Sequence, residues 1–340
     1  MAAGASGTPT SLIWLRCRSS SSRKSRGART PVSEPDAVAA RADADGFSLG
    51  QFVLHMASPL GRKVSFFAET SFTPRSNTFN VELERLSVRY DVDDRLKISM
   101  GRYHTPINYW NTAFHHGLWL QTTIRRPEMI QIGGVFQPVH FVGLLAEGAV
   151  GPPTVGLGYN VGVGNGRGAL IGRGGDAGDV NRNRAWLAKV YVRPAQLYGV
   201  EAGAAVYHDL ITTTGSPGFR EIISSAYVAL SRETPEIIAE FANVNHRDPA
   251  GGATFNSRAF YVQAAYRPPS LPQWKPYYRF ERLFGVDGEP VFGNVDQTIS
   301  TAGVRHELTD VAAIKLEYRN RRESSAPRSN GAFVQVAFVF

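Results

Sequence analysis

Long hydrophobic runs are missing from this 340-residue sequence. A transmembrane helix needs about 18 or more consecutive apolar residues. The longest apolar segment, 141–150, is short and contains Glu147. Hydrophobic residues make up 43% of the chain, which suffices for a folded protein but not for a bundle of membrane helices. The sequence therefore encodes no membrane-spanning helix.

Cysteine is almost absent, and neither sign of charge dominates. The single cysteine, Cys17, lies near the amino terminus, so the rest of the chain cannot form a disulfide framework. The net charge is +8, and it is +5 beyond residue 46, because seven basic and four acidic residues precede that point. Such an excess is too small to predict nucleic-acid binding. We expect no nucleic acid, metal ion or cofactor.

The first 46 residues differ in character from the rest. They include the low-complexity stretch Ser19–Arg29, and their one apolar island, Leu12–Leu15, is followed rather than preceded by basic residues. A secretory signal needs the reverse order and a longer apolar core. We therefore expect residues 1–46 to be a disordered or non-native segment, and residues 47–340 to form the folded domain.

Alternation of apolar and polar residues begins after Phe47. In segment 154–164, for example, Leu157 and Val161 share one face and Asn160 lies on the other. A period of two predicts β-strands, because successive side chains of a strand point to opposite faces. About fifteen such segments can be counted: 47–56, 63–72, 81–90, 95–104, 136–149, 153–164, 184–193, 197–208, 220–231, 236–246, 257–267, 275–284, 296–306, 311–321 and 332–340.

The connections between these segments alternate between short and long. Short turns are expected at 90–95, 149–154, 193–197, 232–236 and 307–311, and long ones at 72–80, 104–136, 165–184, 209–220, 246–257, 284–296 and 320–332. Short turns at one rim and long loops at the other are typical of outer-membrane barrels. We therefore predict an all-β fold, a transmembrane antiparallel up-and-down β-barrel of about sixteen strands in the outer membrane. A soluble β-sandwich is the alternative.

The two faces of the predicted strands have different compositions. The apolar face is expected to contact lipid, and it includes Val200, Val206, Leu157, Val161, Leu316 and Ile314. The other face is rich in charge and glycine and is expected to line a wet lumen. Lumen-facing candidates are Lys63, Lys97, Glu201, Arg279, Glu281, Lys315, Glu317 and Arg319. Aromatic residues near strand ends fit interfacial girdles.

Two segments resemble known proteins. The chain ends on an apolar strand, and Phe338 and Phe340 resemble the carboxy-terminal signal by which the barrel assembly machinery recognises outer-membrane barrels. The stretch 101–129, GRYHTPINYWNTAFHHGLWLQTTIRRPEM, resembles porin-like proteins, and the nearest group is the phosphate-selective porin O/P family. The resemblance implies a sixteen-stranded, often trimeric channel with a loop folded into the pore. The basic residues that give that family its selectivity have no match here.

The longest connection carries the candidate pore residues. We expect a loop near 104–137 to fold inward and constrict the pore through His104, Asn108, Trp110, Asn111, His115, His116, Trp119, Arg125 and Arg126. Amides, imidazoles and aromatic faces can together replace a solute's hydration. The alternatives are an aromatic loop that stiffens the wall, and an ion pair of the arginines with Glu128. A metal site is disfavoured, since no carboxylate lies among the histidines.

The predicted function is passive diffusion of small hydrophilic solutes, with a weak preference for anions because of the +5 charge. An outer-membrane barrel hydrolase and a closed structural or adhesion barrel are the rivals. We predict that the chain is not an enzyme. His208 with Asp209, and His246 with Asp248, are expected to be solvated residues at the mouths of loops.

The start of the chain does not fit an even number of strands. Counted back from Phe340, segment 47–56 descends from the outer rim, so one ascending strand before it is missing from the pattern. Residues 1–46 show no convincing strand. We therefore expect a fragment or a mis-assigned start, with the first strand and an export signal upstream of this chain.

Overall fold

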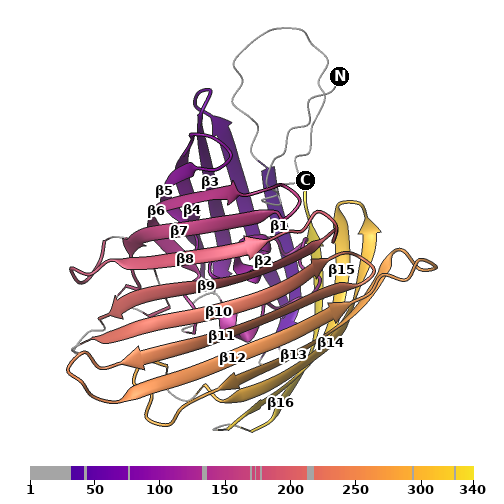
Figure 1. The fold of residues 1–340 in the computed structure, drawn as a ribbon. Helices are drawn as coiled ribbons and strands as arrows, with labels where there is room; N and C mark the ends of the chain where they lie inside the picture. Colours follow the sequence, from indigo (N-terminus) through magenta and orange to yellow (C-terminus); the bar gives the residue numbers. More distant parts are fainter. Residues whose placement is uncertain are drawn as a thin grey trace.

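The computed structural model describes residues 32–41, 44–75, 77–131, 136–168, 171–172, 174–176, 178–212, 218–292, 295–324 and 327–340, with backbone alone at 32–48. Within these residues, sixteen antiparallel strands form one closed barrel (Figure 1). They are β1 (Val32–Arg41), β2 (Ala44–Pro59), β3 (Val64–Arg75), β4 (Thr78–Asp91), β5 (Lys97–His104), β6 (His140–Val150), β7 (Leu157–Asn165), β8 (Ala185–Val192), β9 (Val200–Ile211), β10 (Phe219–Ser231), β11 (Glu236–Arg247), β12 (Thr254–Ala265), β13 (Trp274–Phe284), β14 (Gln297–Thr309), β15 (Ala312–Glu323) and β16 (Ser329–Phe338). The predicted fold class is confirmed.

The barrel closes between its first and last strands. Each strand pairs with its neighbours in the chain, and β1 pairs with both β2 and β16, where Asp36 lies opposite Ala337. The expectation that residues 1–46 contain no strand is therefore wrong. Pro35 and a register shift between Pro35 and Ala37 explain why β1 escaped the pattern, since a proline inside a run argues against a strand. The expected disorder and lack of a signal peptide in 1–31 lie outside the described residues.

Alternation along each strand separates an outer face from a lumen face. In β10, Ile223 and Tyr227 are buried, whereas Ile222 and Val228 are exposed. The exposed apolar side chains recur around the barrel, as expected of an outer band that faces lipid. All the residues predicted to face lipid are exposed or half-buried, and all the predicted lumen residues except Lys63 are buried or half-buried.

Turns dominate one rim and loops the other, with two corrections. Lys63 lies in the turn between β2 and β3, where it is exposed and its ammonium donates to the carbonyl of Val92. It does not face the lumen, because the strand begins only at Val64. The long loop expected at 72–80 is also absent from the described residues, since β3 ends at Arg75 and β4 starts at Thr78. Pro74 stays extended there and lies opposite Phe79.

Glycines on the lumen face accommodate tyrosine rings from the neighbouring strand. The register places Gly158 opposite Tyr191, Gly203 opposite Tyr227 and Gly303 opposite Tyr277. A Cβ added at any of these three glycines would overlap the facing ring. The glycine-rich face that the sequence assigns to the lumen therefore lets aromatic rings lie flat against the wall.

The connection 105–139 is the longest between two strands and carries the helical segments α1 (Trp110–Ala113) and η1 (Glu128–Ile130). Over the described part of the chain, no helix is long and apolar enough to cross a membrane.

Candidate functional site

Wall cations hold the middle of the long loop. Arg279, on the lumen face of β13, donates to the Oγ1 atom of Thr123 at 2.9 Å and to the carbonyl oxygens of Arg125 and Arg126 at 2.8 and 3.2 Å. On β15, the Nζ atom of Lys315 donates to the carbonyl of Thr123 at 3.2 Å. These contacts join residues about 150 to 190 positions apart in the chain, and they place the loop against the lumen face.

Wall carboxylates accept hydrogen bonds from loop N–H groups. Glu240 on β11 accepts from the backbone nitrogens of Tyr109 and Trp110 at 3.1 and 2.8 Å. Glu317 on β15 accepts from the backbone nitrogen of Ile124 at 2.9 Å. Buried backbone donors without partners are costly, and a loop lacks the ladder that would supply them. The carboxylates of the wall therefore supply the acceptors that the buried N–H groups of the loop need.

Ion pairs complete the attachment to this wall. Glu128 in the loop pairs with Arg319 at 2.7 Å and with Arg321 at 3.5 Å, both on β15. Arg305 on β14 donates to the carbonyl of Gln121 at 3.0 Å. Glu128 thus has two partners on the wall, Arg319 and Arg321. The alternative, an ion pair of Glu128 with the loop arginines, stays a prediction.

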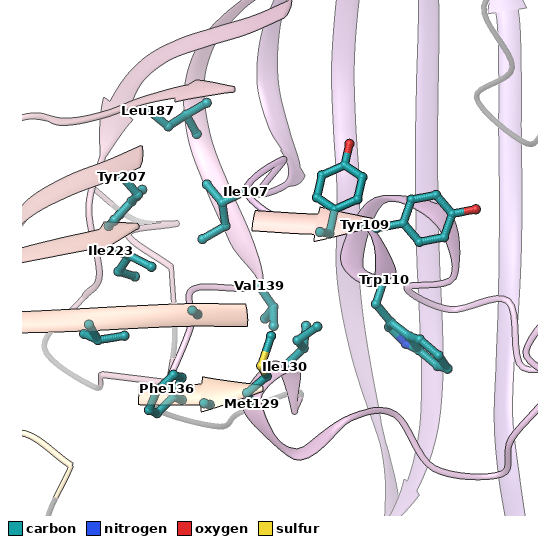
Figure 2. Packing of buried hydrophobic residues seen from close by; sticks show 14 of the residues in the cluster. Ile107, Tyr109, Trp110, Met129, Ile130, Phe136, Val139, Leu187, Tyr207 and Ile223 are labelled. Atoms are coloured by element: carbon teal, nitrogen blue, oxygen red, sulfur yellow. The ribbon is translucent and has the colours of Figure 1, made fainter. Parts of the chain in front are cut away.

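Apolar side chains bury the two ends of the loop. Figure 2 shows Ile107 beside Leu187, Tyr207 and Ile223 of the wall. Trp110 is fully buried, 6.2 Å from the ring of Tyr261 in an edge-on arrangement. Buried aromatic surface contributes strongly to packing. Trp110 thus packs against the wall, as in the alternative of an aromatic loop, and a role in stiffening the wall stays a prediction.

A cavity of about 1360 Å³ lies on the short-turn side of the loop. Of the nine constriction candidates, His104 and Trp119 line it, and the others in its lining from the loop are Pro106, Tyr109, Thr112, Ala113, Phe114, Leu120 and Thr122. Asn108, Trp110, Asn111, His115, His116 and Arg126 are buried instead, and Arg125 stacks on the ring of Phe333 at 4.6 Å. Sequence reasoning thus found the loop but not the side of it that faces the cavity.

The cavity lining is rich in charge, with a basic excess. Nine arginines and lysines face six carboxylates: Arg85, Arg89, Lys97, Lys189, Arg193, Arg232, Arg267, Lys275 and Arg305 against Glu147, Glu201, Glu233, Glu236, Glu307 and Asp310. The Nζ atom of Lys189 lies 4.7 Å from the centre of the Tyr227 ring. Among the predicted lumen residues, Lys97 and Glu201 line the cavity, whereas Arg279, Glu281, Lys315, Glu317 and Arg319 are buried on the lumen face.

Four histidines gather where the loop meets β5 and β6. His104 and His115 stack with ring centres 3.6 Å apart, and His116 and His140 lie beside them. Burial, together with the neighbouring His104, His116 and Arg126, holds the pKa of His115 well below its usual value. The sequence linked three of these histidines but missed His140, and it missed Glu69 and Glu84, which reach the cluster from β3 and β4.

A second buried polar cluster lies toward the long-loop rim. His246 sits between Glu221 at 2.8 Å and Glu289 at 2.5 Å, and Asp209 accepts a hydrogen bond from the backbone nitrogen of Arg167 at 2.7 Å. His246 and Asp209 are therefore not solvated loop-mouth residues. They are buried because Glu289 and Phe292, which follow β13, pack against His246, and Arg167, which follows β7, bonds to Asp209.

Comparison with solved structures identifies the fold. The chain is similar to an anion-selective porin from Comamonas acidovorans (TM-score 0.65, 12% identity, 91% of this chain and 98% of that one). It is also similar to the outer membrane channel DcaP of Acinetobacter baumannii (TM-score 0.61, 12% identity, 91% and 94%). The chain has a porin fold. A third similar structure is OmpT, an outer membrane protein of Vibrio cholerae, in a trimer form (TM-score 0.57, 11% identity, 91% and 98%).

No protein-family model and no curated protein sequence matches the chain. The porin fold thus rests on the course of the backbone, which these structures share at identities of 11–12%.

Proposed function

We propose that the chain is an outer-membrane channel for passive diffusion of small hydrophilic solutes. The observation that carries the proposal is the loop 105–139, which crosses the lumen face of a closed barrel and borders a charged cavity of about 1360 Å³. Outer-membrane channels combine an apolar exterior, a polar interior and an aqueous path. The exposed apolar side chains of the outer face support a location in the outer membrane.

Anions are the preferred solutes in this proposal. The cavity lining carries nine basic and six acidic side chains. An excess of one sign of charge along a narrow pore raises the local concentration of the opposite ion. The similar Comamonas protein is named an anion-selective porin. The finer resemblance, to the phosphate-selective porin O/P family, stays a prediction, and phosphate is one of the solutes to test.

Planar-bilayer recording of the full chain tests the channel. We expect stable ohmic steps and a reversal potential, under a KCl gradient, that favours chloride. Deleting Asn108–His116 should raise the single-channel conductance, because the loop borders the cavity. A deletion in the 248–253 connection, which does not line the cavity, serves as the control. Silent membranes would refute the channel, and an unchanged conductance would place the loop outside the conduction path.

A barrel hydrolase is the rival from another class. The sequence at Gly46–Gly50, GFSLG, has the spacing of a nucleophile elbow. An elbow requires a sharp turn from a strand into a helix, whereas these residues lie inside β2. Turnover of ester or peptide substrates by the full chain, lost on Ser48→Ala, would favour the hydrolase. A closed structural barrel would show neither conductance nor turnover.

We also propose a homotrimer as the assembly, with the barrel assembly machinery as a partner during insertion. The similar OmpT structure is described in a trimer form. The terminal rings of Phe338 and Phe340 lie 6.3 Å apart at the end of β16. Cross-linking in native membranes tests the trimer, and removal of Phe340 tests recognition. Normal insertion without Phe340 would contradict its role as a signal.

A further inference from the structure

Four buried imidazoles converge at the junction of the loop and the wall. His104 ends β5 and lies opposite His140, the first residue of β6. His115 and His116 follow α1 in the loop. One nitrogen of each ring lies within 4.8 Å of the nitrogens of the others, and all four residues are buried. Histidine is the commonest metal ligand among side chains. Whether the cluster can bind a metal ion depends on which ring nitrogens carry a proton and which carry a lone pair.

The tautomer of His115 follows from Asn111. The amide nitrogen of Asn111 donates to the carbonyls of Thr105 at 3.2 Å and Val139 at 2.8 Å, which fixes its Oδ1 atom on the other side. This Oδ1 lies 2.7 Å from the Nδ1 atom of His115, so Nδ1 carries the proton. The Nε2 atom then holds a lone pair. It is buried, and no hydrogen-bond partner for it exists among the described residues.

His116 has the same arrangement. Its Nδ1 atom lies 2.7 Å from the Oε1 atom of Gln51, whose Nε2 donates to Thr73, so His116 donates from Nδ1. Its Nε2 atom faces the Oε2 atom of Glu84 at 3.2 Å. Two acceptors that face each other repel unless a cation or a proton lies between them. Metal-binding histidines commonly donate their other ring N–H to a carbonyl or carboxylate in this way.

Glu84 links the cluster to a fourth imidazole. Its Oε2 atom also lies 3.0 Å from the Nε2 atom of His140, whose Nδ1 accepts from Arg102 at 3.0 Å. His140 therefore carries its proton on Nε2, the atom that faces Glu84, and a metal ion on that nitrogen would displace this proton. Release of protons is the normal consequence when a metal binds histidine.

We propose that His104, His115, His116 and His140 bind a divalent transition-metal ion, with the carboxylate of Glu84 beside it. Imidazole nitrogen suits Zn²⁺, Cu²⁺, Ni²⁺ and Co²⁺, whereas Ca²⁺ and Mg²⁺ require oxygen ligands. Two ligands come from the loop and two from the β5–β6 wall. The ion thus ties the loop to the wall opposite the one that holds its backbone.

Neighbouring charges moderate the affinity of the site. Arg85 neutralises Glu69 at 2.6 Å, which leaves Glu84 as the carboxylate nearest to His116 and His140. Arg126 and Arg102 are opposing cations. The guanidinium of Arg126 donates to Asn111 at 3.1 Å and lies 3.4 Å from the Nδ1 atom of His115, and that of Arg102 donates to His140 at 3.0 Å. Replacement of Arg126 by methionine should therefore tighten metal binding.

Cobalt titration of the metal-free full chain in detergent micelles tests the site. We expect one Co²⁺ per chain, visible absorption bands of a nitrogen-ligated ion, displacement by Zn²⁺, and no response to Ca²⁺. Absence of these bands in the wild-type chain would overturn the proposal without any variant. Zn²⁺ should also raise the thermal midpoint of the folded barrel, since a ligand that binds only the folded state stabilises it.

Matched variants separate ligands from bystanders. His115→Gln and His116→Gln should abolish the Co²⁺ bands, and Asn111→Ala should weaken binding by about 10–100-fold because it removes the support of one ligand. His208→Gln is the control, since His208 stacks on Trp186 away from the cluster. Circular dichroism and heat-dependent gel mobility report folding of each variant. Unchanged Co²⁺ spectra in folded His115→Gln and His116→Gln would refute the assignment.

Discussion

The long loop meets one wall of the barrel largely through its backbone, with added ion pairs of Glu128, and meets the opposite wall through its histidine side chains. On β11–β15, charged wall side chains such as Arg279 and Glu240 bond to loop carbonyl and N–H groups. On β3–β6, loop histidines meet wall histidines and Glu84. Many contacts with the first wall depend on the course of the loop backbone, although the side chain of Glu128 adds an ion pair with Arg319 there. The second depends on His115 and His116 themselves.

The difference assigns separate tasks to the two walls. A wall that bonds to backbone sets where the loop lies, since backbone groups are present at every residue. Where a wall bonds to side chains, the attachment of the loop can depend on a further condition, such as a bound metal ion. Substitutions on the first wall should therefore change stability in any buffer, whereas those on the second should act mainly on metal binding.

Arg279→Met should produce the largest loss. Arg279 is fully buried, pairs with Glu281 at 2.8 Å and donates to the loop carbonyls of Arg125 and Arg126. Removing one partner of a buried ion pair costs about 3–5 kcal/mol, because the remaining charge stays buried. Urea unfolding of the chain in lipid vesicles measures the change. Arg322→Met, at an exposed position, is the control. Equal losses of unfolding free energy in the two variants would show that Arg279 does not hold the loop on this wall.

The two faces of β7 provide the next test. Val161 is exposed on the outer face and the adjacent Asn160 is buried on the lumen face. Arginine near the midplane of the lipid face costs about 2–4 kcal/mol, so Val161→Arg should lower stability by that amount. Asn160→Arg should instead shift the reversal potential toward anions, with little loss of stability. Equal effects of the two substitutions on stability would contradict the assignment of faces.

Glu240→Gln probes the backbone-bonding wall with a smaller change. The carboxylate accepts from the backbone nitrogens of Tyr109 and Trp110 and from the hydroxyl of Tyr261. Glutamine keeps the volume but turns an NH₂ group toward one of these donors. The loss should be about 1.5–3 kcal/mol, the range for hydrogen bonds to charged groups. Asp287→Asn, in an exposed loop, should change the urea midpoint by much less.

Strands and faces were predictable from the sequence because they depend on local periodicity. The alternation around Val161 or Leu316 correctly separates the exposed face from the lumen. The sequence pattern missed β1 for a local reason as well, because Pro35 argues against a strand. The pairing with β2 and β16 forms the strand despite this proline.

The orientation of loop residues was not predictable in the same way. Which side of the loop faces the cavity depends on partners such as Glu240, which lies about 130 positions beyond Trp110. No period in the sequence links the two. The histidine cluster was not predictable for the same reason, because Glu84 and His140 lie on different strands. A sequence scan that pairs each loop histidine with carboxylates on neighbouring strands could have found it.

Ser225→Ala should have the smallest effect and tests whether the loop is held as one unit. The Oγ atom of Ser225 donates to the carbonyl of Ile107, near the point where Glu240 holds Tyr109 and Trp110. Loss of one neutral hydrogen bond costs about 0.5–1.5 kcal/mol. Ser224→Ala, on the outer face of the same strand, is the matched control and should leave the urea midpoint unchanged. Because both contacts hold the same short stretch of loop, the double substitution Ser225→Ala with Glu240→Gln should cost less than the sum of the two single losses. Strict additivity would mean that the two contacts hold the loop independently, and that the backbone-bonding wall is a set of separate attachments.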